Sequence, residues 1–103
     1  MPTEVSLGPF RLLRTQFLFL EGDKPVPLGS RAPEILIALL ERRGELVSKQ
    51  DLMARVWPNA FVEPENLTVH MSALRRALRD GQDRNRFIID IPGRGYCFIA
   101  SVM

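Results

Sequence analysis

The apolar side chains change their spacing twice along the chain, and this change is the strongest constraint on the fold. Before residue 29, short β-type runs occur at residues 10–13, 17–20 and 26–28, separated by turn-forming residues. Between Ser30 and about Asp80 the apolar residues recur with helical spacing, and from Phe87 onward the β-type pattern returns. Strands, then helices, then strands predict an α+β fold.

Three helices are expected over about residues 31–80. Ser30 can cap the first helix, and Gly44 ends it. Ser48 and the Asp three residues later resemble a capping box for a short second helix, which ends before Pro58.

The third helix begins at Pro64 and is expected to end near Asp80. Its apolar residues recur at i, i+4, i+7 and i+11, which predicts that one face is buried; these residues are Leu67, Met71, Leu74 and Leu78. The opposite face and its flanks are mostly short, polar, methyl-bearing or basic, and they carry Glu65, Asn66, Thr68, Val69, Ser72, Ala73, Arg76 and Arg79. Such a face is either an ordinary solvated surface or one that enters the major groove of DNA, where methyl groups can contact thymine. The apolar Val69 on this face favours a binding surface.

The last part of the chain predicts a β-hairpin. Runs at residues 87–91 and 96–100 flank Pro92 and Gly93, which are the residues that a type II turn prefers at its two central positions. Arg94 is therefore expected at or beside the tip of the hairpin.

Charge and residue counts narrow the function. Residues 1–65 hold eight basic and nine acidic residues (−1), whereas residues 66–103 hold six arginines and three aspartates (+3), an asymmetry that indicates a polyanionic partner. One cysteine and one histidine exclude an internal disulfide and a Cys/His zinc site. Neither a membrane-spanning run nor a signal peptide is found, so a cytoplasmic protein is expected. No residues group as nucleophile and base, and we predict no enzyme activity, cofactor, metal or small-molecule ligand.

Two segments, residues 57–78 and 91–98, resemble the OmpR/PhoB type of winged helix-turn-helix domain in bacterial transcription regulators of the C-terminal-effector family. The resemblance extends over about residues 9–102 and implies one winged-helix domain over residues 1–103. That domain would contain a four-stranded antiparallel sheet at about residues 4–28, three helices, and a wing hairpin at about residues 87–100. Because no receiver domain precedes residue 1, we expect the N-terminal domain of a longer regulator.

The resemblance also assigns roles to residues. It implies that the third helix lies in the major groove, with Asn66, Thr68, Val69, Ser72 and Ala73 toward the bases and His70 and Arg75 toward phosphates. Arg76 and Arg79 also lie where phosphates would pass. The wing residues at the minor groove or its phosphates would be Arg94 and Tyr96. Trp57 matches a position that contacts the DNA backbone, although it can equally be a core residue. The loop that contacts RNA polymerase in relatives corresponds to Asn59, Ala60, Phe61, Val62 and Glu63.

Two functions follow from these patterns. The first is sequence-specific binding of double-stranded DNA, with two copies expected on the DNA because one small module buries limited surface. The second is a winged-helix protein-interaction module that has lost DNA binding, since Ser72 and Ala73 stand where several relatives have arginine.

Overall fold

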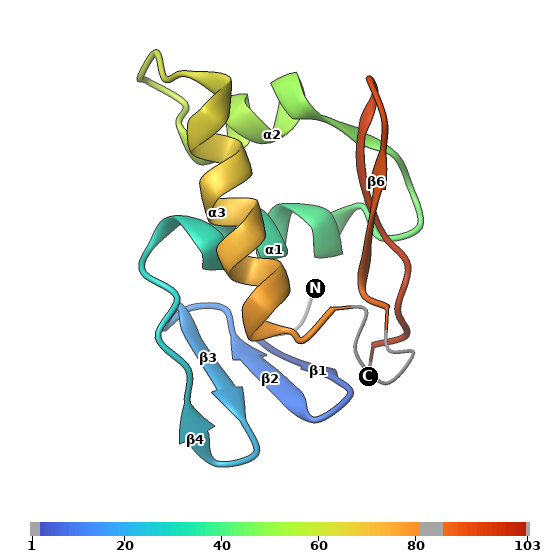
Figure 1. Cartoon of the computed structure of the whole chain (residues 1–103). Helices are drawn as coiled ribbons and strands as arrows, with labels where there is room; N and C mark the ends of the chain where they lie inside the picture. Colours follow the sequence, from blue (N-terminus) through green and yellow to red (C-terminus); the bar gives the residue numbers. More distant parts are fainter. Residues whose placement is uncertain (1–2, 81–85, 103) are drawn as a thin grey trace.

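The computed structural model describes residues 3–80 and 86–102, and its elements follow the order expected for a winged helix (Figure 1). Four antiparallel strands come first, in the spatial order β1-β2-β3-β4: β1 (Glu4–Leu7), β2 (Phe10–Leu13), β3 (Leu18–Glu21) and β4 (Lys24–Pro25). The remaining elements are α1 (Arg31–Glu41), β5 (Val47–Ser48), α2 (Lys49–Val56), α3 (Pro64–Ala77), β6 (Ile88–Ile91) and β7 (Gly95–Phe98). The predicted α+β winged helix-turn-helix is confirmed.

The N-terminal sheet differs from the sequence expectation in its last strand. The run predicted at residues 26–28 forms no strand, because the chain pairs with β3 directly after the turn at Gly22, with Lys24 opposite Glu21. Only one further backbone bond, from Val26 N to Phe19 O at 2.8 Å, continues this pairing. Pro25, which has no N–H to donate, lies on the edge strand as expected.

The two predicted helix caps have different outcomes. The Ser48 hydroxyl accepts a hydrogen bond from Asp51 N at 3.0 Å, which confirms the cap of α2. Ser30 occupies the cap position of α1, but its side chain forms no cap hydrogen bond. Its backbone has φ −97° and ψ −26°, whereas a capping side chain requires an extended backbone to reach the first free N–H groups.

The third helix ends earlier than predicted. Helix α3 stops at Ala77, and Arg79 adopts a left-handed backbone with φ 54°. Arg79 N donates to Arg76 O at 3.0 Å and Asp80 N to Arg75 O at 2.9 Å, which together form a Schellman motif. Arg79 therefore lies beyond the helix and not on its flank.

A second sheet contains the wing. Strand β7 lies between β5 and β6 and is antiparallel to both. The hairpin turn closes through Arg94 N to Ile91 O at 2.9 Å, and Gly93 has φ 74°, as a type II turn requires at its second central position. At Gly95 a β-carbon would overlap the backbone of Val47, so only glycine permits the pairing with β5. The strand β5 was not expected from the sequence.

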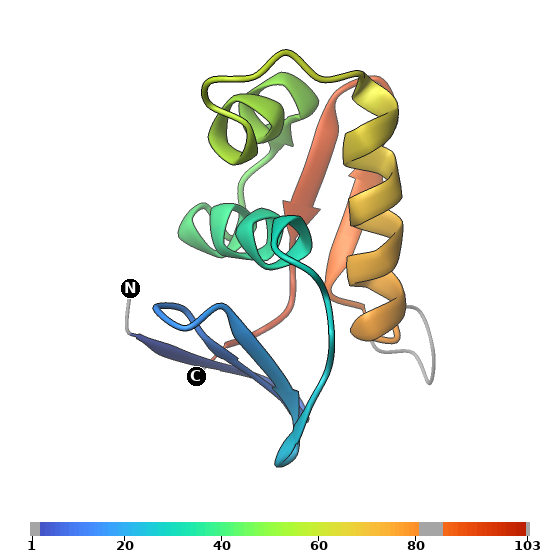
Figure 2. The same ribbon diagram turned by 90° about the vertical axis from the view of Figure 1, so that its left-hand side faces the viewer.

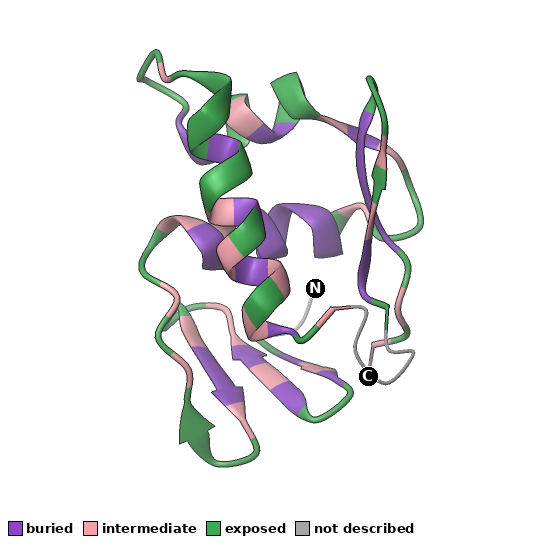
Figure 3. Ribbon diagram, viewed as in Figure 1, coloured by how far each residue is buried: buried purple, intermediate pink, exposed green. Residues whose placement is uncertain are grey.

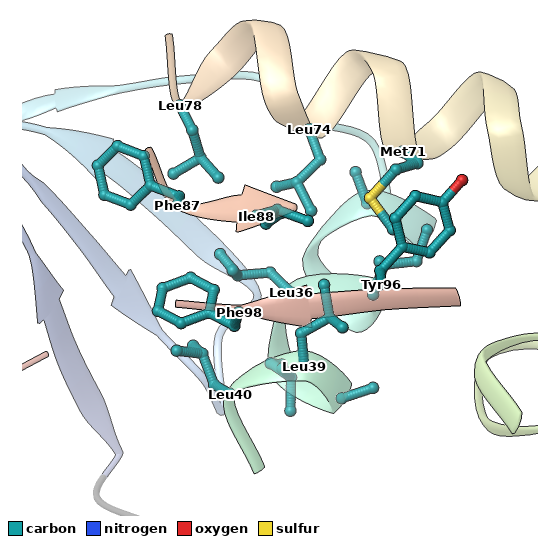
Figure 4. Packing of buried hydrophobic residues seen from close by; sticks show 14 of the residues in the cluster. Leu36, Leu39, Leu40, Met71, Leu74, Leu78, Phe87, Ile88, Tyr96 and Phe98 are labelled. Atoms are coloured by element: carbon teal, nitrogen blue, oxygen red, sulfur yellow. The ribbon is translucent and has the colours of Figure 1, made fainter. Parts of the chain in front are cut away.

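The helices and the hairpin surround one apolar core (Figure 4). Three side chains of α3 and its C-cap point toward β6 and α1, and all are at most 2% exposed: Met71, Leu74 and Leu78. Phe87, at the root of the hairpin, packs against Phe10 of the N-terminal sheet and Phe98 of β7, with ring centroids 5.9 and 6.4 Å apart. The core thus joins α3, the hairpin and the N-terminal sheet.

Candidate nucleic-acid interface

Helix α3 has one buried face and one open face, as its periodicity predicts (Figure 3). The predicted core residues Leu67, Met71, Leu74 and Leu78 are at most 2% exposed. The exposed residues of the other face are Glu65, Asn66, Thr68, Val69, Ser72 and Arg76, whereas His70 and Ala73 are half-buried. Val69 is 63% exposed, so its branched apolar side chain is accessible to a partner on this face.

The arginines of α3 point in different directions. Arg76 is exposed, and no side chain in residues 3–80 or 86–102 forms an ion pair or hydrogen bond with it. Arg75 is half-buried, donating from Nε to the Asp80 carboxylate at 2.9 Å and from Nη2 to Ile88 O at 2.9 Å. Arg79 extends from the turn after the helix and pairs with Glu21 of β3 at 3.1 Å. Only Arg76 therefore combines an open position on α3 with a guanidinium that nothing in the described chain engages.

Asp80 is a residue whose importance the sequence interpretation missed. Its side chain is 2% exposed, and besides Arg75 it accepts a hydrogen bond from Phe87 N at 2.7 Å. The only sequence signal is an acidic residue directly after an arginine-rich helix end, which is common on protein surfaces. Its two backbone donors, Phe87 N and Ile88 N, lie at the start of the hairpin, across residues 81–85, which fall outside the described chain.

Trp57 lies between the helices and contacts two basic side chains. It is 9% exposed, and its ring centroid is 5.8 Å from that of His70 and 5.7 Å from Cζ of Arg31. Arg31 also donates to Val56 O at 2.8 Å. This burial agrees with the core role that was one of the two expectations for Trp57, and it leaves little indole surface for a DNA backbone.

The two predicted wing residues differ in access. Arg94 is exposed in the hairpin turn, while Tyr96 is 5% exposed and packs beside Met71 (Figure 4). Burial raises the pKa of Tyr96 above its ordinary value of 10.0. The negative charge of Asp90, its cross-strand neighbour, raises that pKa further, and the positive charge of Arg75 partly opposes both. Tyr96 is therefore a neutral, buried residue of β7 close to the turn, and Arg94 is the accessible wing residue.

The hairpin and α3 extend in similar directions, side by side (Figure 2). The hairpin turn lies at the same end of the molecule as the N-terminal half of α3 in both views (Figures 1 and 2). An elongated partner could thus contact the open face of α3 and Arg94 together.

The loop between α2 and α3 forms an open apolar hollow of about 450 Å³. Phe61 of this loop is 96% exposed, and Val62 packs partly against the core. The hollow is lined by residues of α2, of the loop and of the first turn of α3, including Met53, Ala54, Trp57, Phe61, Val62 and Pro64.

Two kinds of feature are absent from the described ranges, residues 3–80 and 86–102. Their helices are too short and too polar to cross a bilayer. Within the same ranges no three histidine, cysteine, aspartate or glutamate side chains gather as a metal site.

A short helix, a second helix with an open face, and a hairpin beside it define a winged helix-turn-helix domain. The chain matches the family "Transcriptional regulatory protein, C terminal" over residues 23–98, and it belongs to this family. The resemblance to OmpR/PhoB-type domains is thereby confirmed.

Individual relatives agree with this assignment. The chain is 39% identical over 79 residues to the transcriptional regulator HilA of Salmonella typhimurium, covering 77% of this chain but only 14% of HilA. The DNA-binding domain of Escherichia coli CadC superimposes with a TM-score of 0.86 at 23% identity, over 99% of this chain and 96% of that one. DrrB, an OmpR/PhoB homologue of Thermotoga maritima, gives a TM-score of 0.81 at 28% identity, over 95% of this chain and 45% of DrrB.

Proposed function

We propose that this chain is the sequence-specific DNA-binding domain of a bacterial transcription regulator, with α3 in the major groove and the hairpin at the minor groove or its phosphates. Its role is binding and not catalysis. Family membership and the names of the relatives support DNA binding and transcription regulation.

The observation that carries the proposal is the open face of α3. Thr68, Val69 and Ser72 form a strip of short side chains that allows close approach to base edges, and Val69 offers methyl groups to thymine. Arg76 lies on the same face with its guanidinium unengaged by the described chain, which suits a phosphate contact. The Arg75 guanidinium is bonded to Asp80 and Ile88 O, and Tyr96 is buried, so Arg76 and Arg94 make the DNA contacts in this proposal.

The test is the selection of bound sites from random double-stranded DNA, followed by titration of the selected site at several salt concentrations. We expect affinity to fall with salt, and Arg76→Ala to weaken binding and reduce the salt slope by about 1. Arg11→Ala is the matched control, since Arg11 carries the same charge but lies in the N-terminal sheet, paired with Glu4 at 3.1 Å. Equal behaviour of the two variants would contradict the placement of α3.

The alternative, a winged-helix protein-interaction module without DNA binding, is decided by the same titration. Absence of binding at micromolar protein and low salt would favour that module. The exposed Phe61 and the hollow beside it would then be the first surface to examine for a protein partner.

We further propose that the loop at residues 59–63 contacts RNA polymerase. Phe61 extends from it almost fully exposed, while Trp57 and Val62 hold the loop ends against the core. Phe61→Ala should leave DNA affinity unchanged and lower transcription by reconstituted polymerase. Unchanged transcription with this variant would place the contact elsewhere.

We also propose that two copies of the domain bind one operator. This binding would take place in the cytoplasm. A domain of 103 residues presents one helix and one wing, which limits the surface that it can bury on DNA. Measurement of protein-to-DNA stoichiometry on the selected site tests this expectation, and one copy per site at saturation would contradict it.

A further inference from the structure

The end of α3 is tied to the root of the wing by an ion pair between the half-buried Arg75 and the buried carboxylate of Asp80. The Asp80 carboxylate, 2% exposed, receives Arg75 Nε at 2.9 Å and Phe87 N at 2.7 Å. Arg75 Nη2 in turn donates to Ile88 O at 2.9 Å. A side chain of α3 and the residue of its Schellman turn therefore hold the backbone at the point where β6 begins.

The energy of such a pair does not by itself explain its presence. Removing two charges from water offsets most of their attraction, so apolar residues can often replace a buried ion pair without loss of stability. Leu78 and Phe87 already bury an apolar contact surface at this place. What the ion pair adds is direction, because charge-assisted hydrogen bonds restrict angles more strongly than apolar packing does.

A change in the angle of β6 at the root of the hairpin displaces the turn at its tip. Strand β6 leads from Ile88 to Ile91 and directly into the turn that contains Arg94. At ~3.3 Å per residue this lever is ~13 Å long, so a rotation of about 10° at the root moves the tip by about 2 Å. A shift of that size exceeds the tolerance of a hydrogen bond to phosphate.

We infer that Asp80, acting with Arg75, is a positioning residue for DNA binding: it sets the wing relative to α3, so that Arg94 and the open face of α3 reach one DNA site together. The inference rests on the proposed function. Asp80 itself contacts no DNA in this arrangement, and its effect passes through Arg94.

A double-mutant cycle on the selected DNA site tests the inference. Asp80→Asn keeps the shape of the side chain, removes its charge, and places an amide where the carboxylate meets Arg75. We expect Arg94→Ala to weaken binding about tenfold in the wild-type chain and less than about threefold when combined with Asp80→Asn. Since the cycle compares the same Arg94 change in both backgrounds, the general gain from removing one negative charge cancels.

Glu21→Gln is the matched control. It removes the Arg79 ion pair, which ties the same end of α3 to β3 but does not touch the wing. Arg94→Ala should retain its full effect in this background. Hydroxyl-radical footprinting adds a second readout: Asp80→Asn should lose the protection due to the wing and keep that due to α3.

The outcomes separate this inference from the proposed function. If Arg94→Ala lowers DNA affinity by the same factor in the wild-type chain and in the Asp80→Asn background, the inference is wrong, but the proposed DNA binding is not contradicted. If the wild-type chain binds no DNA, the proposed function fails and the inference fails with it. Should Asp80→Asn not fold, Arg75→Lys keeps a cation for Asp80 while losing the bond to Ile88 O, and the same loss of coupling is expected.

Discussion

Two neighbouring arginines of α3 show how differently the two sides of this helix are used. Arg75 is half-buried and bonded to Asp80 and to the backbone of Ile88, so its guanidinium is already engaged within the domain. Arg76, the next residue, is exposed, and its guanidinium has no ion-pair or hydrogen-bond partner in residues 3–80 and 86–102. One residue step on a helix turns the side chain by 100°, which is enough to change an internal tie into an available cation.

The difference teaches that exposure, and not residue type, separates the open face of α3 from its supporting face, the one that packs against the rest of the domain. Arg75 and four buried apolar side chains hold α3 to α1 and the hairpin, whereas Val69, Ser72 and Arg76 are on the open side. The four apolar residues are Leu67, Met71, Leu74 and Leu78. Substitutions on the supporting face should therefore change stability first, and those on the open face should change DNA binding with little effect on stability.

The largest expected effect is on the supporting face. Leu74→Ala removes a fully buried side chain, so the free energy of unfolding should fall by about 2–5 kcal/mol through lost apolar contact and the cavity that remains. Urea denaturation measures this change. Val69→Ala, on the open face, should stay within about 0.5 kcal/mol of the wild type. Similar losses for the two variants would contradict the division of the helix.

The next largest effect on stability is expected from the contrast between Arg75 and Arg76. Arg75→Ala leaves the buried Asp80 carboxylate and Ile88 O without their arginine partner and should cost about 1–3 kcal/mol of unfolding free energy. Arg76→Ala should change stability by less than about 0.5 kcal/mol. Thermal or urea unfolding of both variants under the same conditions checks the contrast, and equal stability would mean that the internal bonds of Arg75 carry no net weight.

A smaller effect is expected at the methyl groups of the open face. Val69→Ala removes two methyl groups that we place near thymine, and each buried CH₂-sized group contributes ~0.8 kcal/mol. Affinity for the selected site should fall by up to about fifteenfold, the equivalent of both methyl groups being fully covered, with less change on a site whose thymines are replaced by uracils. Fluorescence polarisation with the two DNA duplexes measures this. An equal loss on both duplexes would place Val69 away from the thymine methyl groups.

The smallest effect concerns Tyr96 at the boundary between the two sides. Burial and the charge of Asp90 raise its pKa in the folded chain, so stability from this residue is complete below pH 10.0 and is lost as pH rises from there through the raised value. Relative to the wild type, Tyr96→Phe should therefore become more stable as the pH rises above 10.0, because it has no phenol to ionise. Urea denaturation at each pH follows the difference, and a constant difference would contradict the raised pKa.

Much of the fold could be predicted because it depends on local pattern. The helical spacing of Leu67, Met71 and Leu74 identified α3 and its buried face, and Pro92-Gly93 identified the turn of the wing. Less could be predicted where the end of an element, or a short strand, depends on pairing with another part of the chain. The strand at Lys24–Pro25 depends on its register with β3, and β5 exists only because β7 lies beside it.

The candidate site divides in the same way. The open face of α3 and the exposed tip residue Arg94 follow from periodicity and turn chemistry, which act within a few residues. Other features depend on segments that are distant in the sequence. These features are the internal bonds of Arg75, the pairing of Arg79 with Glu21, and the burial of Trp57 and Tyr96. A helical wheel shows which side a residue faces but not what lies there.

The sequence by itself therefore determined which elements form, in which order, and which face of α3 is apolar, since these depend on residue spacing and on the turns that proline and glycine favour. The tertiary structure alone decided which arginines are available to a partner and made Asp80 the link between helix and wing. The physical reason is that a charged side chain takes its role from the groups that packing brings within hydrogen-bond reach. For Asp80 these include the backbone N–H groups of Phe87 and Ile88, seven and eight residues further along the chain at the start of β6.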